Sequence, residues 1–121
     1  MKKITIIDYG TSNLKSIDGA FKYLGYNTDI TNDKKKIANC ETLVLPGVGA
    51  FPVVMDYLKK KGLDSAIKEY VLSNKPFLGI CLGMQLLFDT SYEFKKTTGL
   101  GILNGDVKDL NKENKKNKYL V

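Results

Sequence analysis

Residues 76–85 read Pro76-Phe77-Leu78-Gly79-Ile80-Cys81-Leu82-Gly83-Met84-Gln85, an apolar run with one cysteine near its centre. The apolar residues before Cys81 predict a buried strand, and those after it predict a helix. Gly79 and Gly83 stand two residues on either side of the cysteine and leave room for a sharp turn between the two elements. This pattern predicts a reactive thiol held at a strand-to-helix turn.

Upstream of this run, short apolar strands alternate with amphipathic helices. The strands expected are 3–7, 28–31, 42–45 and 77–80, and the helices expected are 14–24, 53–60, 64–73 and 82–88. The strand Thr42-Leu43-Val44-Leu45 is apolar along most of its length, as is typical of a strand buried on both faces of a parallel sheet. The alternation predicts an α/β fold with a parallel sheet and flanking helices.

Downstream of residue 88 the pattern changes. Segments 99–103 and 106–107 are expected to form a hairpin, because the dipeptide Asn104-Gly105 favours a tight turn. Residues 111–118 consist only of asparagine, lysine and glutamate, so this segment has no apolar side chain to bury. We therefore expect one domain over residues 1–110 and a flexible Lys/Asn-rich tail over residues 111–121.

The composition narrows the classes of partner and compartment. The 121 residues carry a net charge of +6, but all 19 basic residues are lysine, whereas arginine is the usual reader of phosphates and guanine. We therefore expect no nucleic-acid partner. No stretch has the length or flanks of a signal peptide or a membrane span. The two cysteines, Cys40 and Cys81, then fit a reducing compartment, so we expect a cytoplasmic protein with a free thiol at Cys81.

The surroundings of Cys81 favour nucleophilic chemistry. The pattern Gly-x-Cys-x-Gly after a buried strand is similar to the nucleophile elbow of α/β hydrolases. A thiol at the amino-terminus of a helix experiences the partial positive charge of unpaired amide groups, which favours the thiolate. The backbone N–H of Leu82 would face the same reacting carbon. The alternative is that Cys81 is only a small buried residue in a packed turn.

A second glycine-containing loop, Pro46-Gly47-Val48-Gly49, follows the strand at 42–45. Its amides can turn toward a ligand and stabilise an oxyanion, although such loops also end strands for purely conformational reasons. This loop and the Cys81 turn both follow the carboxyl ends of expected parallel strands, which is where open α/β sheets bind ligands. We expect the two loops to converge on one carbonyl group.

Four segments together carry a resemblance to a known family. They are Ile7-Asp8-Tyr9-Gly10 with Asn13, Leu45-Pro46-Gly47-Val48-Gly49-Ala50-Phe51, Gly79-Ile80-Cys81-Leu82-Gly83-Met84-Gln85-Leu86-Leu87, and Gly99-Leu100-Gly101. The chain resembles the amino-terminal part of class I (triad) glutamine amidotransferases, in particular the glutaminase subunits of imidazole glycerol phosphate synthases. The resemblance implies a flavodoxin-like parallel sheet with flanking helices, truncated before the carboxy-terminal half, and a partial amidotransferase domain over residues 1–110.

The resemblance also implies a chemistry and a partner. Cys81 would hydrolyse glutamine through a glutamyl thioester, and the ammonia would pass to a cyclase subunit with a (βα)8 barrel, with no cofactor or metal. Gly47, Val48, Gly49 and Leu82 would form the oxyanion site, Gln85 and Glu93 would bind the amino-acid end of glutamine, and Asn13 would lie toward the partner interface. The alternative for Gln85 and Glu93 is ordinary polarity of a solvent-facing helix and loop.

One departure from the family concerns the catalytic base. Family members carry a later His-x-Glu segment, in which histidine activates the thiol and glutamate orients it, whereas these 121 residues contain no histidine. We therefore expect the glutaminase activity of this chain to be impaired. We also expect the incomplete sheet to be marginally stable or to self-associate.

Three other functions are compatible with the sequence. The chain could be a non-catalytic remnant that only docks a synthase partner. It could instead supply ammonia to a surface-sugar amidotransferase, because Tyr92-Glu93-Phe94 resembles the paralogues that do so. A simple cysteine hydrolase or chaperone of the related elbow-containing superfamily is the third, but many of those place histidine directly after the cysteine, where this chain has Leu82.

Overall fold

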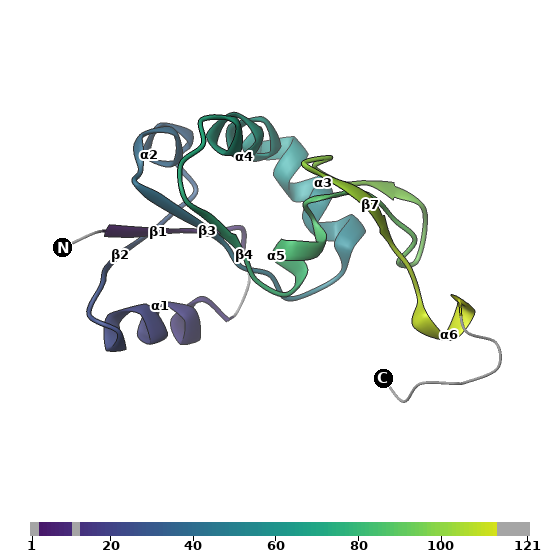
Figure 1. Ribbon diagram of the computed structural model, residues 1–121, viewed down its shortest axis with the longest axis horizontal. Helices are drawn as coiled ribbons and strands as arrows, with labels where there is room; N and C mark the ends of the chain where they lie inside the picture. Colours follow the sequence, from purple (N-terminus) through teal and green to yellow (C-terminus); the bar gives the residue numbers. More distant parts are fainter. Residues whose placement is uncertain (1–2, 11–12, 114–121) are drawn as a thin grey trace.

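A parallel four-stranded sheet forms the centre of the molecule. The computed structural model describes residues 3–10 and 13–113. The strands are β1 (Lys3–Ile7), β2 (Asn27–Thr31), β3 (Thr42–Leu45) and β4 (Phe77–Gly79), arranged in the order β2-β1-β3-β4 with every neighbouring pair parallel (Figure 1). These are the first four strands of the flavodoxin-like order. The predicted α/β fold with a parallel sheet is confirmed.

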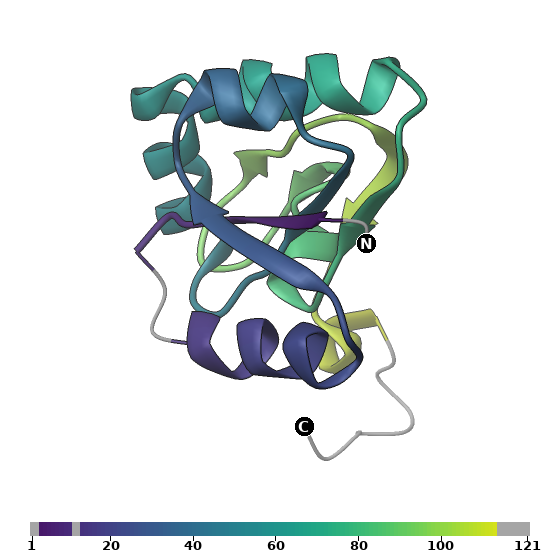
Figure 2. The same ribbon diagram turned by 90° about the vertical axis from the view of Figure 1, so that its left-hand side faces the viewer.

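Helices cover both faces of this sheet. Helix α1 (Leu14–Tyr23) lies on one face, and α2 (Lys34–Asn39), α3 (Phe51–Lys61) and α4 (Leu63–Leu72) lie on the other (Figures 1 and 2). The short helix α5 (Leu82–Gln85) follows β4 directly. Helix α2 was not expected, because its six residues include a single buried apolar side chain, Ile37, and therefore show no periodicity.

The apolar side chains of the strands alternate between the two faces. Ile6 and Val44 are paired in register and point toward α1 with Ile4, whereas Ile7, Leu43 and Leu45 join the larger core under α2, α3 and α4. Full burial of an aliphatic side chain of this size contributes roughly 1.5–3 kcal/mol. The larger core thus fixes the carboxyl end of β3, from which the loop at residues 46–49 starts.

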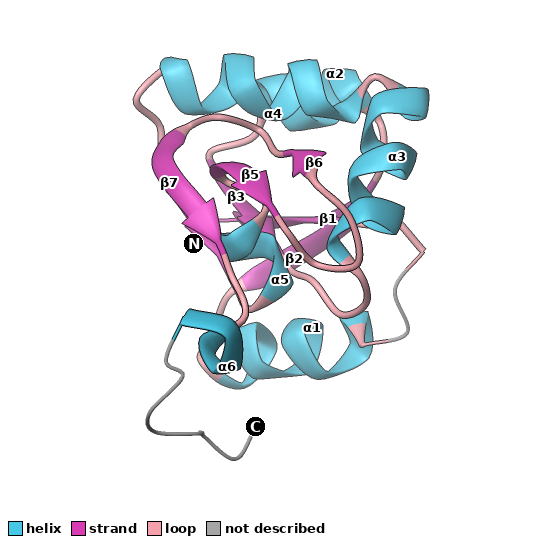
Figure 3. Cartoon of the chain, turned by 90° about the vertical axis from the view of Figure 1, so that its right-hand side faces the viewer, coloured by secondary structure: helices cyan, strands magenta, loops and turns pink. Residues whose placement is uncertain are grey.

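A second, smaller sheet follows α5. It consists of β5 (Phe88–Ser91), β6 (Thr97–Thr98) and β7 (Leu103–Val107) in the order β6-β5-β7, and it stands beside α3 and α5 (Figures 1 and 3). Strand β5 pairs antiparallel with β6 and parallel with β7. Helix α6 (Leu110–Glu113) follows β7.

The helix expected over 82–88 is too long. It ends at Gln85, and β5 begins at Phe88. The helical pattern breaks at Leu87, whose N–H bonds to the carbonyl of Met84, three residues back, at 3.2 Å, whereas the N–H of Leu86 still bonds to Leu82 at 2.9 Å. The carbonyl oxygens of Leu86 and Leu87 then accept hydrogen bonds from the N–H groups of Leu100 and Ile102, both at 2.8 Å, which join this segment to the second sheet.

The hairpin expected at Asn104-Gly105 is wrong. Both residues lie inside β7, which pairs with β5 at Leu103, Asp106 and Val107. The register shifts there, because Phe88 pairs with Leu103 and Thr90 pairs with Asp106, so β7 carries one extra residue. Gly105 has φ +134° and donates its N–H to Asp89 Oδ2 at 3.1 Å. The glycine serves a bulge and not a turn.

The expected tail over 111–121 lies mostly outside the described residues. Residues 111–113 belong to α6, and 114–121 are outside the part that the structure describes. The division of the chain at residue 110 stays a prediction.

Candidate functional site

Cys81 occupies a sharp turn between β4 and α5. Its backbone has φ +54° and ψ −121°, a conformation that residues other than glycine rarely adopt. Cys81 is exposed to solvent. The carbonyl oxygen of Cys81 accepts hydrogen bonds from the N–H groups of Met84 (3.0 Å) and Gln85 (3.2 Å), and Gly83 donates to the carbonyl of Ile80 at 2.9 Å. These hydrogen bonds fix the backbone of the turn that carries the thiol. The alternative of a buried cysteine is therefore excluded.

The second loop packs directly against this turn. A Cβ atom on Gly47 would lie 2.5 Å from the backbone nitrogen of Gly83 and 2.7 Å from Cβ of Leu82. A Cβ atom on Gly83 would overlap the carbonyl oxygen of Leu45. Both glycines are therefore required for the close approach of the two backbones. The structure thus brings the end of β3 and the Cys81 turn together, as the sequence predicted.

Tyr9 is hydrogen-bonded to the same loop from the protein interior. Its hydroxyl donates a hydrogen bond to the carbonyl oxygen of Pro46, and the ring is almost fully buried. Burial raises the pKa of Tyr9, so the hydroxyl stays protonated and remains a donor. Sequence reasoning assigned no role to Tyr9. The available signal was its position directly after a buried strand, where a tyrosine hydroxyl needs a buried acceptor.

The four residues of the expected oxyanion site differ in exposure. Gly47 and the side chain of Leu82 are buried, whereas Val48 and Gly49 are exposed at the tip of the loop. Gly49 has φ +123°, and a Cβ atom there would meet no atom within 4 Å. The tip is therefore open on the side away from the core. The oxyanion role of these residues stays a prediction.

Gln85 and Glu93 line one cavity of about 650 Å³. Tyr92, Phe94 and residues 107–111 complete its wall. Gln85 is half-buried and lies one helical turn after Cys81, whose carbonyl accepts its N–H, but neither Cys81 nor the 47–49 loop is among the residues that line this cavity. The structure thus brings the two expected substrate-binding residues together, and Tyr92, Phe94 and the 107–111 segment are cavity residues that the sequence reasoning had not assigned to it.

Glu93 also contacts the start of α3. Its Oε2 atom accepts a hydrogen bond from the backbone N–H of Phe51 at 3.4 Å, and its own N–H donates to Oγ of the buried Ser91 at 3.1 Å. Phe51 follows the second loop within two residues. Glu93 therefore links the cavity to the loop that carries Val48.

Asn13 lies apart from this cluster. It is exposed and precedes α1 as its N-cap residue, without a capping hydrogen bond from its side chain. Helix α1 is on the opposite face of the parallel sheet from α3, and Asn13 is not in the wall of the cavity lined by Gln85 and Glu93. Its expected place at a partner interface stays a prediction.

Two general features concern the described residues only. In residues 3–10 and 13–113, no three side chains of histidine, cysteine, aspartate or glutamate come close enough to hold a metal ion. Within the same ranges, every helix is too short or too polar to cross a lipid bilayer.

Solved structures support the fold. A crystal structure of a glutamine amidotransferase aligns with a TM-score of 0.69 at 17% identity, covering 85% of this chain and 54% of the other. A putative peptidase E protein from Listeria monocytogenes EGD-e aligns with a TM-score of 0.64 at 17% identity, covering 74% of this chain and 50% of the other. At this level of identity, both similarities show the fold alone.

Sequence relatives are more specific. The chain is 55% identical over 112 residues to the imidazole glycerol phosphate synthase subunit HisH of Caldanaerobacter subterraneus subsp. tengcongensis, covering 93% of this chain and 55% of the relative. It is 50% identical to the subunits of the same name from Bacillus cereus and Lactococcus lactis, covering 88% of this chain and 51% and 53% of the relatives. The chain therefore spans about half the length of these curated relatives. The family model of class-I glutamine amidotransferases matches residues 5–118, and the chain belongs to that family.

Proposed function

We propose that this chain carries the nucleophile and oxyanion half of a glutaminase that supplies ammonia for histidine biosynthesis. The thiolate of Cys81 attacks the side-chain amide carbon of glutamine, and the carbon–nitrogen bond breaks as the nitrogen takes up a proton and leaves as ammonia. Water then cleaves the glutamyl thioester, which releases glutamate and restores the thiol. The observation that carries this proposal is the exposed Cys81 in a positive-φ turn, packed against the Gly47 loop.

The surrounding residues would then have separate tasks. The N–H groups of Val48 and Leu82 stabilise the negative oxygen of the tetrahedral intermediate, an effect typically worth about 3–4 kcal/mol for each donor. The cavity residues Gln85 and Glu93 hold the amino-acid end of glutamine, where the Glu93 carboxylate pairs with the ammonium group. Gly47 and Gly49 let the loop present its amides.

The chain needs a base from elsewhere. An ordinary cysteine is only a few per cent thiolate at neutral pH, and a positioned general base typically adds about a hundred- to ten-thousand-fold in rate. The 121 residues contain no histidine, so none of them is the usual base of a cysteine hydrolase. We therefore propose that this chain alone turns over glutamine very slowly and that a second polypeptide segment supplies the base.

The relatives support a proposal for the acceptor of the ammonia. Those quoted above are named as subunits of imidazole glycerol phosphate synthase, and this favours a (βα)8-barrel cyclase in the cytoplasm as the partner. Asn13 would face this partner. The segment Tyr92-Glu93-Phe94, which resembles the paralogues that supply a surface-sugar amidotransferase, is the feature that favours this second candidate.

The test measures release of ammonia and glutamate from glutamine. The chain is mixed with its cognate synthase, with and without a separately expressed polypeptide corresponding to the carboxy-terminal part of the Caldanaerobacter relative. We expect turnover only with that polypeptide, loss of turnover in Cys81→Ser and retention in Cys40→Ser. Silence in every mixture would overturn the glutaminase proposal and leave a docking remnant. Turnover by the chain alone at the rate of a complete relative would overturn the need for an external base.

A further inference from the structure

Tyr9 connects the end of β1 to the loop at residues 46–49. Its hydroxyl donates a hydrogen bond to the carbonyl oxygen of Pro46, and both residues are buried. A Cβ atom on Gly47 would lie 2.6 Å from this hydroxyl oxygen. The tyrosine therefore occupies the space beside Gly47 and supplies the hydrogen bond that a buried carbonyl group needs.

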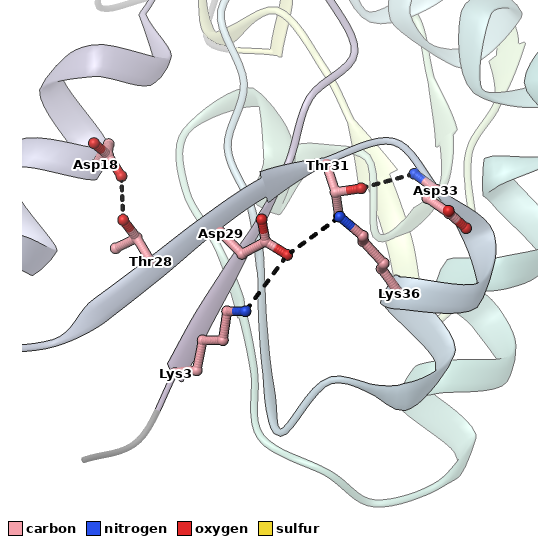
Figure 4. Close-up of polar contacts among 7 residues, drawn as sticks. All are labelled: Lys3, Asp18, Thr28, Asp29, Thr31, Asp33 and Lys36. Carbon is pink, nitrogen blue, oxygen red and sulfur yellow. Dashed lines mark hydrogen bonds and ion pairs between the residues drawn. The ribbon is translucent and has the colours of Figure 1, made fainter.

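The strand that carries Tyr9 is bonded to β2 at both of its ends. At the first residue of β1, Lys3 forms an ion pair with Asp29 of β2 at 3.8 Å (Figure 4). At the other end, the N–H of Asp8, directly before Tyr9, donates a hydrogen bond to the carbonyl oxygen of Thr31 at 2.9 Å. The Tyr9 ring itself belongs to the larger apolar core. Its hydroxyl therefore has a fixed position against the loop.

The hydrogen bond at Pro46 fixes the orientation of one peptide group. The carbonyl of Pro46 and the N–H of Gly47 belong to the same planar unit. Gly47 has no side chain that would restrict its own backbone dihedral angles. The next N–H along the chain is that of Val48, which we propose as an oxyanion donor. The bond from Tyr9 thus fixes the peptide group that directly precedes this donor.

We infer that Tyr9 is a positioning residue, which holds the loop at residues 46–49 in the conformation that stabilises an oxyanion next to the Cys81 thiol. Tyr9 acts through the carbonyl of Pro46 and not by contact with the substrate. A donor is effective only when it lies about 2.7–3.1 Å from the oxygen that becomes negative, so a small displacement of the loop lowers the rate. The inference rests on the oxyanion part of the proposed function, but its test needs no glutamine.

The test compares two reagents at Cys81 in the 121-residue chain. A Cys40→Ser background leaves Cys81 as the single thiol. Iodoacetamide reacts at a saturated carbon, where the sulfur–carbon bond forms as iodide leaves and no oxyanion arises. With p-nitrophenyl acetate, the thiolate adds to the ester carbonyl, whose oxygen becomes negative. The p-nitrophenolate then leaves without a proton, and an acetyl thioester remains. Only the second reaction depends on the oxyanion site.

Tyr9→Phe removes the hydroxyl and keeps the ring. We expect acetylation of Cys81 to slow by about tenfold or more, because the loss of one oxyanion donor typically costs about a hundredfold or more. Alkylation by iodoacetamide should change by less than about twofold. Peptide mass spectrometry at early times measures both rates, and their ratio cancels any change in the thiolate fraction.

Tyr70→Phe is the matched control. Tyr70 is buried as well, and its hydroxyl donates to the carbonyl of Pro76 at 2.8 Å, just before β4 and away from the loop at residues 46–49. If Tyr9 had a purely structural role, both variants would lose stability and neither would change the ratio of the two rates. In the complemented enzyme, Tyr9→Phe should lower kcat for glutamine with little change in KM, because the oxyanion exists only after substrate binding.

Both variants are first checked for a native melting transition. If Tyr9→Phe lacks one, the two rates are measured at low temperature in a Gly19→Ala background, where the added methyl group meets no atom within 4 Å and favours α1. Failure to fold even there would assign Tyr9 to the stability of the fold and overturn the inference.

Each further outcome supports or overturns the inference. Equal slowing of both reactions in Tyr9→Phe, unchanged acetylation, or the same selective slowing in Tyr70→Phe would overturn it. Selective slowing of acetylation together with silence toward glutamine in every mixture would support the inference and overturn the glutaminase proposal. Ammonia release without selective slowing would do the reverse.

Discussion

The Glu93 carboxylate accepts a hydrogen bond from the backbone N–H of Phe51, at 3.4 Å and across 42 positions of sequence. Phe51 is the first residue of α3, an eleven-residue helix whose amino-terminus carries partial positive charge. Glu93 therefore interacts with this helix and also lines the cavity next to Gln85. A substrate ammonium group that pairs with Glu93 would compete with the helix for the same carboxylate.

Glu93→Gln keeps an acceptor for Phe51 and removes the charge. We expect the free energy of unfolding to fall by no more than about 1 kcal/mol, the scale of a charge at a helix terminus. In the complemented enzyme, KM for glutamine should rise by about tenfold or more with a smaller change in kcat if Glu93 has the substrate-binding role that we propose. Steady-state kinetics and a denaturant melt measure the two effects. Glu69→Gln, an exposed change on α4, is the control, and an equal rise in KM there would contradict the role of Glu93.

The two cysteines should differ in reactivity toward iodoacetamide. The Cys81 thiol is exposed in its turn, whereas Cys40 is half-buried and its thiol donates a hydrogen bond to the carbonyl of Ile37 at 3.1 Å. We expect Cys81 to be alkylated about tenfold faster than Cys40 in the native protein, because access and thiolate character control the rate. Peptide mass spectrometry over a time course measures both sites at once. Equal rates in the native protein that also equal those in denaturant would show that the fold does not distinguish the thiols.

Gly83→Ala should be strongly destabilising. The added methyl group would overlap the carbonyl oxygen of Leu45, so the Cys81 turn and the end of β3 would have to separate. We expect a loss of about 2–4 kcal/mol in the free energy of unfolding, the range of severe steric substitutions. Gly19→Ala is the matched control, because its methyl group would meet no atom within 4 Å and it lies inside α1. That variant should be stabilised by up to about 1 kcal/mol. A similar melt for both variants would argue against the close packing of the two loops.

Tyr70 should contribute a loss of stability at alkaline pH. Its hydroxyl lies within hydrogen-bond distance of the carbonyl oxygens of Pro76 (2.8 Å) and Glu41 (3.3 Å), and burial raises its pKa to about 12. The unfolded chain loses this proton near pH 10 and the folded chain only near 12, so the free energy of unfolding falls with rising pH between these values.

Tyr70→Phe should therefore show a shallower loss of stability between pH 10 and 12, by up to about one proton in the slope. Tyr23→Phe is the control, because Tyr23 is almost fully exposed. Denaturant melts at fixed ionic strength across this range measure the slope, and comparing variants cancels the titration of the lysines. Parallel slopes for Tyr70→Phe and the unmodified chain would contradict the contribution of Tyr70.

The part of the fold that depends on buried periodicity was predictable from sequence. Strand β1 at Lys3–Ile7 and strand β3 at Thr42–Leu45 have the expected bounds, because their apolar side chains are buried and leave few alternatives. The Cys81 turn was predictable as well, because Gly83 is part of the Gly-x-Cys-x-Gly pattern. A side chain at position 83 would overlap the carbonyl oxygen of Leu45. These features are local in sequence.

The features that were missed depend on contacts between distant residues. The residues directly after α5 bond through their carbonyl groups to Leu100 and Ile102, and Gly105 at the bulge bonds to Asp89, sixteen positions earlier. The dipeptide Asn104-Gly105 has the same local preference in a hairpin and in a bulge, so only the strand partner decides between them. Likewise, the contact of Glu93 with Phe51 has no signature in either segment.

The backbone of Cys81, with φ +54° and ψ −121°, is one that glycine adopts more easily than any residue with a side chain. A non-glycine residue in such a sparsely populated region typically costs of order 1–3 kcal/mol, so glycine would be the more stable choice. Substitution of Cys81 by glycine would relax the turn and remove the thiol at the same time. The backbone that presents the sulfur atom to solvent is therefore also a backbone that lowers the stability of the turn.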